Sequence, residues 1–189
     1  MQKIDVNTLQ ENPFHLLGKE WSLVAAGNTE HFDMLTTSWG GLCVLWNKPV
    51  AVVFIRENRY TREFIEANKY VTVSFYGTDR QSRHILNICG TRSGRDCDKA
   101  KELGLSPVAT DNGAVTFKQA RLTLEGRKVY CMPIEEANFL DRAIYEKWYN
   151  DSPGGEKHYA YFLEITNAYV NDDPESRKLL ANDDAGVLW

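Results

Sequence analysis

Two long segments in the last third of the chain constrain the fold most. Residues 158–170 alternate Tyr159, Tyr161, Leu163 and Ile165 with polar or opposite-face residues, and residues 121–132 also have the composition of a strand. Successive side chains of a strand point to opposite faces, so the alternation predicts strands with one face on a core. Long strands that can pair as in a hairpin favour an antiparallel barrel over a doubly wound parallel sheet.

Shorter segments rich in β-branched and aromatic residues predict further strands at residues 22–27, 42–45, 50–55, 70–76 and 115–117. Residues 50–55 are apolar at every position, which predicts a strand covered on both faces. In residues 70–76 the apolar side chains alternate with Thr72 and Ser74, which predicts a half-exposed strand.

Three helices are predicted between the strands. The first covers residues 61–68, with Thr61 capping its first turn. The second covers residues 79–88, and the third covers residues 93–103 behind Ser93-x-x-Asp96, which resembles a capping box. The expected class is therefore mainly β with inserted helices (α+β).

The length and composition predict one domain with a tail. A chain of 189 residues that is 43% hydrophobic can bury one sizeable core. From residue 171 onward the sequence becomes acidic and polar around Pro174, with one weak helical pattern at residues 177–181. We expect a domain over residues 1–170 and a polar C-terminal tail over residues 171–189.

Charge and hydrophobic patterning argue against nucleic-acid and membrane partners. The formal net charge is -4, with acidic and basic residues interspersed, so no basic stripe is present. The first residues lack the apolar stretch of a signal peptide, and the longest apolar run, residues 50–55, is too short to span a bilayer. A cytoplasmic protein is expected.

The cysteines and most histidines indicate no metal site. Four cysteines stand singly, without a Cys-x-x-Cys pair, and are expected to be buried reduced thiols: Cys43, Cys89, Cys97 and Cys131. His15, His31 and His84 are scattered without ligand or triad spacing and receive no role.

Three motifs are candidates for binding. Residues 33–42 form a hydroxyl-rich turn that could aim amides and hydroxyls at a flat heterocycle, or could be an ordinary turn beside a core Trp. Residues 56–61 open a helix, where Arg56 and Thr61 could bind a phosphate monoester, or where the charges are merely solvated. Residues 89–99 form a Gly/Ser-rich segment with three cations, which is either a second anion site or a flexible loop.

Taken together, the three motifs resemble the flavin-reductase-like family, and most closely its flavoredoxin-type branch. The resemblance implies an FMN-binding antiparallel split β-barrel that works as a homodimer, with residues of both subunits completing the flavin groove. It implies roles at the ring edge for Met34, Thr36, Thr37, Ser38 and Trp39. It implies contacts with the ribityl chain and phosphate for Arg56, Tyr60, Thr61, Cys89, Gly90, Ser93, Gly94, Asp96 and Lys99, the last as a point-charge phosphate ligand.

His158 matches the histidine that opens the last strand of the family. The family pattern continues with a glycine, an acid and an aliphatic residue, and Leu163 stands here where glycine is usual, followed by Glu164 and Ile165. The resemblance makes His158 a catalytic candidate beside a nicotinamide. Cys43 likewise replaces a small residue near the expected flavin.

The implied function is an FMN oxidoreductase that transfers hydride from NADH or NADPH through FMN to a flavin or to a protein acceptor. The cofactors carry this chemistry, so the protein needs to stack the rings and stabilise the reduced flavin rather than supply a nucleophile. Two alternatives remain at this point: a non-catalytic split-barrel carrier of flavin or haem, and an interaction protein whose polar turns have no ligand.

Overall fold

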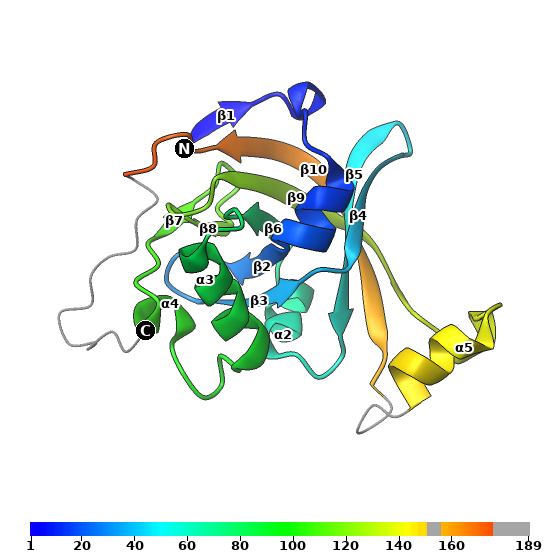
Figure 1. Cartoon of the computed structure of the whole chain (residues 1–189). Coiled ribbons are helices and arrows are strands. Elements are labelled where there is room, and N and C mark those ends of the chain that lie inside the picture. The colour runs from blue at the N-terminus through cyan, green and yellow to red at the C-terminus, as the bar shows by residue number, and fades with distance from the viewer. Residues whose placement is uncertain (151–155, 176–189) are drawn as a thin grey trace.

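One antiparallel sheet of eight strands forms the centre of the computed structural model, which describes residues 1–150 and 156–175 (Figure 1). Seven strands follow the order β3-β2-β6-β9-β10-β5-β4, and β1 pairs with β10. The strands are β1 (Gln2–Ile4), β2 (Ser22–Gly27), β3 (Phe32–Thr37), β4 (Gly40–Leu45), β5 (Lys48–Arg56), β6 (Tyr70–Phe75), β9 (Leu122–Pro133) and β10 (His158–Val170). A separate hairpin joins β7 (Pro107–Ala109) to β8 (Val115–Phe117).

The connection between β3 and β4 shows how the sheet curls. These strands stand at opposite ends of the sheet order, yet only Ser38 and Trp39 separate them in the chain. The Trp39 carbonyl accepts a hydrogen bond from the backbone N–H of Phe54 on β5, at 3.3 Å. The two edges of the sheet therefore approach each other at this turn. The architecture is the expected antiparallel split β-barrel.

Two helices cover both faces of β2 and β3. Those two helices are α2 (Tyr60–Ala67) and α3 (Arg80–Thr91). The other helices are α1 (Pro13–His15), α4 (Lys99–Glu102) and α5 (Arg142–Tyr145), with π-helical turns at Leu16–Glu20 and Glu146–Asn150 and 3-10 turns at Val6–Thr8 and Glu136–Asn138. Phe64 of α2 packs in the barrel core with Val24, whereas Ile85 of α3 packs on the other face with Leu23 and Ala25. Because β2 alternates between two cores, all six of its residues are buried.

The predicted burial of two strands was wrong. The six residues of β6 are buried except for Tyr70, because the hairpin of β7 and β8 covers the face that was expected to be exposed. There the Thr72 hydroxyl donates to the carbonyl oxygen of Val115 at 2.7 Å, so burial leaves it satisfied. Conversely, Val52 and Phe54 of β5 are only half-buried, because within the described residues no element covers that face fully.

The predicted helix over residues 93–103 was also wrong. The Ser93 hydroxyl accepts a hydrogen bond from the N–H of Arg95, a local bond that stabilises a turn instead of a helix. The helix α4 begins only at Lys99, where the Asp98 carboxylate accepts from the N–H of Lys101.

Thr61 does not cap α2. The N-cap position of this helix is Arg59, and the Thr61 hydroxyl donates to Asp33 on β3 instead. The helical pattern at residues 177–181 lies outside the described residues. Within the described residues, no helix is long and apolar enough to cross a membrane.

Candidate functional site

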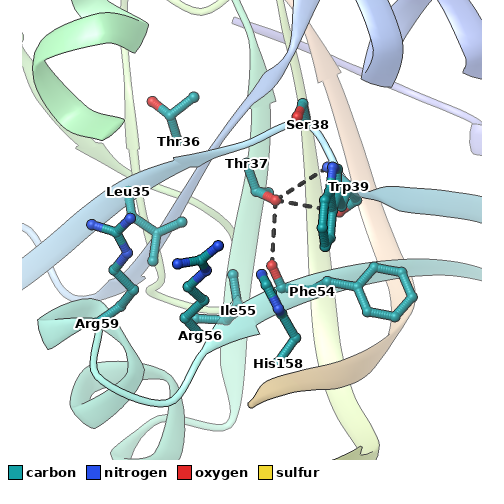
Figure 2. Close-up of a pocket in the computed structure, with 10 residues that line it drawn as sticks. All are labelled: Leu35, Thr36, Thr37, Ser38, Trp39, Phe54, Ile55, Arg56, Arg59 and His158. Atoms are coloured by element: carbon teal, nitrogen blue, oxygen red, sulfur yellow. Dashed lines mark hydrogen bonds between the residues drawn. The ribbon is translucent and has the colours of Figure 1, made fainter. Parts of the chain in front are cut away.

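A cavity of ≈ 160 Å³ lies where the turn between β3 and β4 meets the end of β5 and the start of β10 (Figure 2). Its walls are Leu35, Thr36, Thr37, Ser38, Trp39, Phe54, Ile55, Arg56, Arg59 and His158. The structure therefore brings together six of the predicted site residues, from the first motif, the second motif and the last strand. It adds Leu35, Phe54, Ile55 and Arg59.

The two threonine hydroxyls of this cavity make hydrogen bonds within the protein. Thr36 Oγ1 donates to the carbonyl oxygen of Leu86 on α3, at 2.6 Å. Thr37 Oγ1 accepts from the N–H of Trp39 at 3.3 Å and lies 3.4 Å from the carbonyl oxygen of Phe54 (Figure 2). Residues 32–37 are thus a strand rather than the predicted turn, and these side chains fix the course of the backbone.

Two arginines carry positive charge into the cavity. Figure 2 shows the side chains of Arg56 and Arg59 extending in the same direction, toward Thr36. Arg56 lies 3.9 Å from a carboxylate oxygen of Glu156, and Arg59 donates a long hydrogen bond of 3.5 Å to the carbonyl oxygen of Gly90. Neither contact neutralises the guanidinium tightly, so both cations remain available to an anionic ligand.

His158 is buried at the cavity wall with an unsatisfied ring nitrogen. Its ring stacks at a tilt on Trp39, with centroids 4.8 Å apart, and meets Tyr149 edge-on at 5.6 Å. Nδ1 is buried and has no hydrogen-bond partner among the described residues. Burial, together with the charges of Arg56 and Arg59, lowers the pKa of His158 to about 4. The imidazole is therefore neutral near pH 7, with a buried polar atom that a ligand could satisfy.

Two further cavities continue from the first. One of ≈ 90 Å³ shares Leu35 and Arg59 with it, and the next, of ≈ 460 Å³, shares Tyr60 and Gly94 with the second. The second cavity is lined by Asp33, Leu35, Asn58, Arg59, Tyr60, Thr61, Cys89, Arg92, Ser93, Gly94 and Lys99. Met34 and Asp96 line the third. Shared wall residues therefore place the three cavities beside one another, from the first predicted motif to the other two, and together they are called the groove below. The largest of them lies within the usual volume range of ligand sites, about 300–1,000 Å³.

Lys99 has a different environment from the one expected of a phosphate ligand. Its ammonium is buried, lies 2.9 Å from Asp33 Oδ1 and also donates to the carbonyl oxygen of Met34. The other carboxylate oxygen of Asp33 accepts from the Thr61 hydroxyl at 2.6 Å. The charge of Lys99 is thus balanced inside the protein.

Glycines allow the third motif to approach β3 closely. A Cβ atom on Gly94 would lie 2.2 Å from Asp33 Oδ1, and one on Gly90 would lie 3.4 Å from Thr36 Cβ. Gly94 therefore has no room for a side chain, whereas Gly90 has barely enough.

The cysteines differ in exposure. Cys89 is buried, and its burial raises the pKa of the thiol to about 12. The prediction of buried thiols was wrong for Cys43 and Cys131, which are exposed because Cys43 lies on the outward face of β4 and Cys131 lies in the exposed last part of β9. Within the described residues, no group of three or more His, Cys, Asp or Glu side chains is arranged to hold a metal ion.

The sequence interpretation missed several residues that shape the groove. Asp33 lies in the first motif but has no role in the sequence interpretation. A single acidic residue among strand residues was an available signal, because a buried carboxylate needs a cation or a hydrogen-bond donor beside it. Trp148 and Tyr149 were also missed, and they cover Trp39 and His158 from the segment after α5. Apolar residues four apart at Leu140, Ile144 and Trp148 were an available signal for this helical segment.

Comparison with known families identifies the domain. The flavin reductase like domain matches residues 14–186. The chain belongs to the flavin-reductase-like family. The match spans all three motifs and His158, so the resemblance drawn from these residues is confirmed.

Solved structures share the fold of this flavin-reductase-like domain. Flavoredoxin of Desulfovibrio vulgaris (Miyazaki F) is 19% identical, with a TM-score of 0.60 over 90% of this chain and 78% of that chain. Flavoredoxin from Methanosarcina acetivorans is 19% identical, with a TM-score of 0.60 over 100% of this chain and 95% of that one. An FMN-binding protein from Thermus thermophilus, solved with bound 1-cyclohex-2-enone, is 14% identical, with a TM-score of 0.60 over 90% and 78% of the two chains. A comparison with curated protein sequences gives no significant match.

Proposed function

We propose that this flavin-reductase-like domain binds FMN along the groove and transfers hydride or electrons through it. The observation that supports this most is that neighbouring cavities of the groove share walls: Leu35 and Arg59 line both the cavity beside Trp39 and the cavity beside Thr61. The cavity beside Trp39 is lined by aromatic rings and by the end of β3, and the cavity beside Thr61 is lined by hydroxyls and cations. This arrangement fits a ligand with a flat ring at one end and a phosphate at the other.

The residues present fit FMN by their donor chemistry. The orphaned Nδ1 of His158 is a buried polar atom that a heteroatom of the ring could satisfy. The ring would lie against residues 36–38 and Trp39, and the phosphate would lie near Arg59, Tyr60, Thr61 and Ser93. The polar edge of the ring and the phosphate would thus both meet hydrogen-bond donors.

Bound FMN would supply the hydride and electron chemistry, and the chain would supply position and electrostatics. Arg56 at the ring end favours negative charge on a ligand, which assists reduction of a neutral ring system. His158 is neutral because of burial and the neighbouring arginines, so it acts as a hydrogen-bond partner and holds no charge near the ring. Trp148 and Tyr149 limit the access of water to this end.

We propose NADH or NADPH as the electron donor and a flavin or protein as the acceptor. A nicotinamide needs a flat surface beside the flavin ring and no further acid, base or nucleophile from the protein. The cavity beside Trp39 is bounded by aromatic rings and open to solvent on one side, which is compatible with a second flat ligand.

The proposal includes a homodimer whose contact covers the outer face of β5 and β10. Phe54 and Phe162 are half-buried on these strands, and Tyr130 and Trp46 beside them are exposed. Tyr130 meets Phe162 at 5.4 Å and Trp46 at 6.5 Å, which extends the aromatic surface. Such aromatic surfaces are enriched at protein interfaces. Sedimentation equilibrium of the pure protein should give twice the chain mass, and a monomer would contradict this part of the proposal.

The first test is the visible absorbance of the pure protein, before and after incubation with FMN and removal of the excess. Flavin bands that remain with the protein are expected. Their anaerobic bleaching by NADH or NADPH, faster than that of free FMN in the same buffer, would support the reductase activity. Bound flavin that neither nucleotide reduces would indicate a carrier, a Soret band would indicate haem, and no retained chromophore would refute the proposed function.

A further inference from the structure

A cavity of ≈ 390 Å³ lies outside the groove, at the other end of β5. Its walls include Trp46 of the turn between β4 and β5, Lys48 of β5, Arg127 of β9 and Glu164 of β10. None of its wall residues lines a cavity of the groove. Lys48 and Arg56 are the two ends of β5, which a strand of this length places roughly 25 Å apart (Figure 1). The cavity is therefore separate from the candidate flavin site.

Pairing across three strands brings the charged residues of this cavity to one face of the sheet. Glu164 stands opposite Arg127 on β9 and opposite Val50 on β5. Lys48 lies two residues before Val50 and therefore points to the same face of β5. This is the outer face, because the next residue, Ala51, packs in the barrel core.

A β-bulge interrupts the sheet at the cavity wall. The register of β9 against β10 shifts between Phe162 and Leu163, and Val129 is the extra residue on β9. A bulge bends its strand and redirects the neighbouring side chains. Lys128 turns toward the last turn of α2, where it donates to the carbonyl oxygen of Glu66 at 2.9 Å and lies 3.8 Å from the carboxylate of that residue. The charge of Lys128 is therefore already engaged.

The remaining cations of the cavity exceed its acids. Lys48 and Arg127 both pair with the carboxylate of Glu164, one on each oxygen. The hydrogen bond from Lys48 lowers the pKa of Glu164 despite partial burial, so the carboxylate is ionised near pH 7. Within residues 1–150 and 156–175, no other carboxylate lies within ion-pair distance of either cation. Two cations share one anion, which leaves one positive charge in excess.

An exposed aromatic ring borders this charge. Trp46 and Asn47 form the two-residue loop between β4 and β5, and their φ angles are 52° and 56°. A type I′ hairpin turn requires positive φ at both positions and prefers Asn or Gly, so a bulky residue at the first position strains the turn. The indole of Trp46 is 57% exposed and lines the cavity together with the apolar side chain of Val50. Its ring is accessible to a flat ligand.

We propose that this cavity is a second ligand site, for a small aromatic carboxylate that stacks on Trp46 and pairs with the excess charge of Lys48 and Arg127. The guanidinium of Arg127 matches the geometry of a carboxylate. The volume of ≈ 390 Å³ lies at the lower end of the range of ligand sites, about 300–1,000 Å³, which suits a small ligand. Because Trp46 also belongs to the aromatic surface proposed for the homodimer, a bound ligand would lie at the margin of that contact.

The test is calorimetric titration of the full-length, FMN-loaded protein with three matched probes. Phenylacetate has both the ring and the charge, phenylacetamide lacks the charge, and cyclohexylacetate lacks the aromatic ring. Phenylacetate should bind with a Kd of about 1 mM or less, about tenfold more tightly than phenylacetamide and about fivefold more tightly than cyclohexylacetate. Loading with FMN keeps the probes out of the groove, which also has aromatic rings and cations in its walls.

Two charge variants should change the affinity in opposite directions. Glu164→Gln leaves both cations unpaired and should tighten the binding of phenylacetate about tenfold, whereas Lys48→Met leaves Arg127 balanced by Glu164 and should weaken it about tenfold. Neither change should alter the binding of phenylacetamide. Tighter binding is a readout that a general loss of structure would not give. Lys3→Met is the matched control, since Lys3 lies on β1 outside the cavity and pairs with Asp111.

Trp46→Gly tests the aromatic wall. Glycine adopts positive φ readily, so the turn should remain intact without the indole. The variant should bind phenylacetate about fivefold more weakly and lose less affinity for cyclohexylacetate. Circular dichroism verifies the fold of every variant, and the charge variants and Trp46→Gly test the site independently if one of them does not fold.

Three results would overturn the inference and leave the proposed function intact. They are no binding of phenylacetate to the FMN-loaded wild type, equal affinity for phenylacetate and phenylacetamide, and an affinity for phenylacetate that Glu164→Gln does not raise. If the wild type retains no FMN, the proposed function fails instead. The same titrations of the flavin-free protein then decide this inference, with Arg56→Met expected to leave the affinity for phenylacetate unchanged because Arg56 lines only the groove.

Discussion

His158→Phe should make the stability of this domain less dependent on pH. The native imidazole is buried and stays neutral until about pH 4, whereas in the unfolded chain it titrates near its ordinary pKa of 6.5. As the pH falls through 6.5, the imidazole of His158 binds a proton in the unfolded state but not in the native state. The stability that neutral His158 contributes is therefore complete above pH 6.5 and is lost as the pH falls toward 4.

The magnitude follows from the two pKa values. For one group with pKa values of 6.5 and about 4, linkage gives a loss of about 2 kcal/mol in the free energy of unfolding between about pH 7.5 and about pH 5. In the wild type the ring of His158 lies 4.8 Å from that of Trp39, centroid to centroid, and phenylalanine keeps a ring at this place. No hydrogen bond is lost at Nδ1, because Nδ1 has no partner among the described residues. The variant should therefore fold.

The assay is urea unfolding of wild type and variant at these two pH values, followed by circular dichroism. His15→Phe is the matched control, because the side chain of His15 is exposed. The control should show the same pH dependence as the wild type, and His158→Phe should show about 2 kcal/mol less. Equal pH dependence in all three proteins would refute the assignment of a neutral, buried His158.

Two further predictions concern glycines in close contact. Gly94→Ala should displace the Asp33 carboxylate, which lies 2.2 Å from the new Cβ, and lower the affinity for FMN about tenfold in a direct titration; an unchanged affinity would contradict the described packing. Gly126→Ala should lower the free energy of unfolding by about 1–3 kcal/mol, because its Cβ would lie 2.6 Å from Leu163 Cβ. The double variant Gly126→Ala with Leu163→Gly should lose less free energy of unfolding, measured in urea, than the sum of the losses in the two single variants. Strictly additive losses would exclude the contact.

The strands were predictable where their side chains alternate, and the exceptions have identifiable causes. β3 was interpreted as a turn because Thr36, Thr37 and Ser38 are residues that favour turns when considered alone. Thr36 and Thr37 are strand residues here because β2 provides their ladder partners and α3 provides an acceptor for the Thr36 hydroxyl, whereas Ser38 lies in the connection to β4. Both partners come from other parts of the chain, so local composition gave the wrong answer.

The candidate site was predictable as a set of motifs but not as a set of contacts. The sequence indicates that Lys99 belongs with the other motif residues, and the structure brings it to the same groove. Its carboxylate partner, Asp33, is 66 residues away, and nothing in either local sequence indicates the pairing. The departure at Leu163 has a similar explanation, since its side chain lies against Gly126 on the neighbouring strand and is fully buried.

The short strand β1 has a consequence for association between chains. Along one edge of β10 the partner is β9. Along the other edge β5 pairs only as far as Glu164, and β1 then pairs with residues 168–170 of β10. An uncovered edge offers unpaired N–H and C=O groups to a strand of another molecule. Three residues at the start of the chain therefore protect the domain against edge-to-edge aggregation, and a variant that lacks them should remain foldable but become prone to fibrous assembly at high concentration.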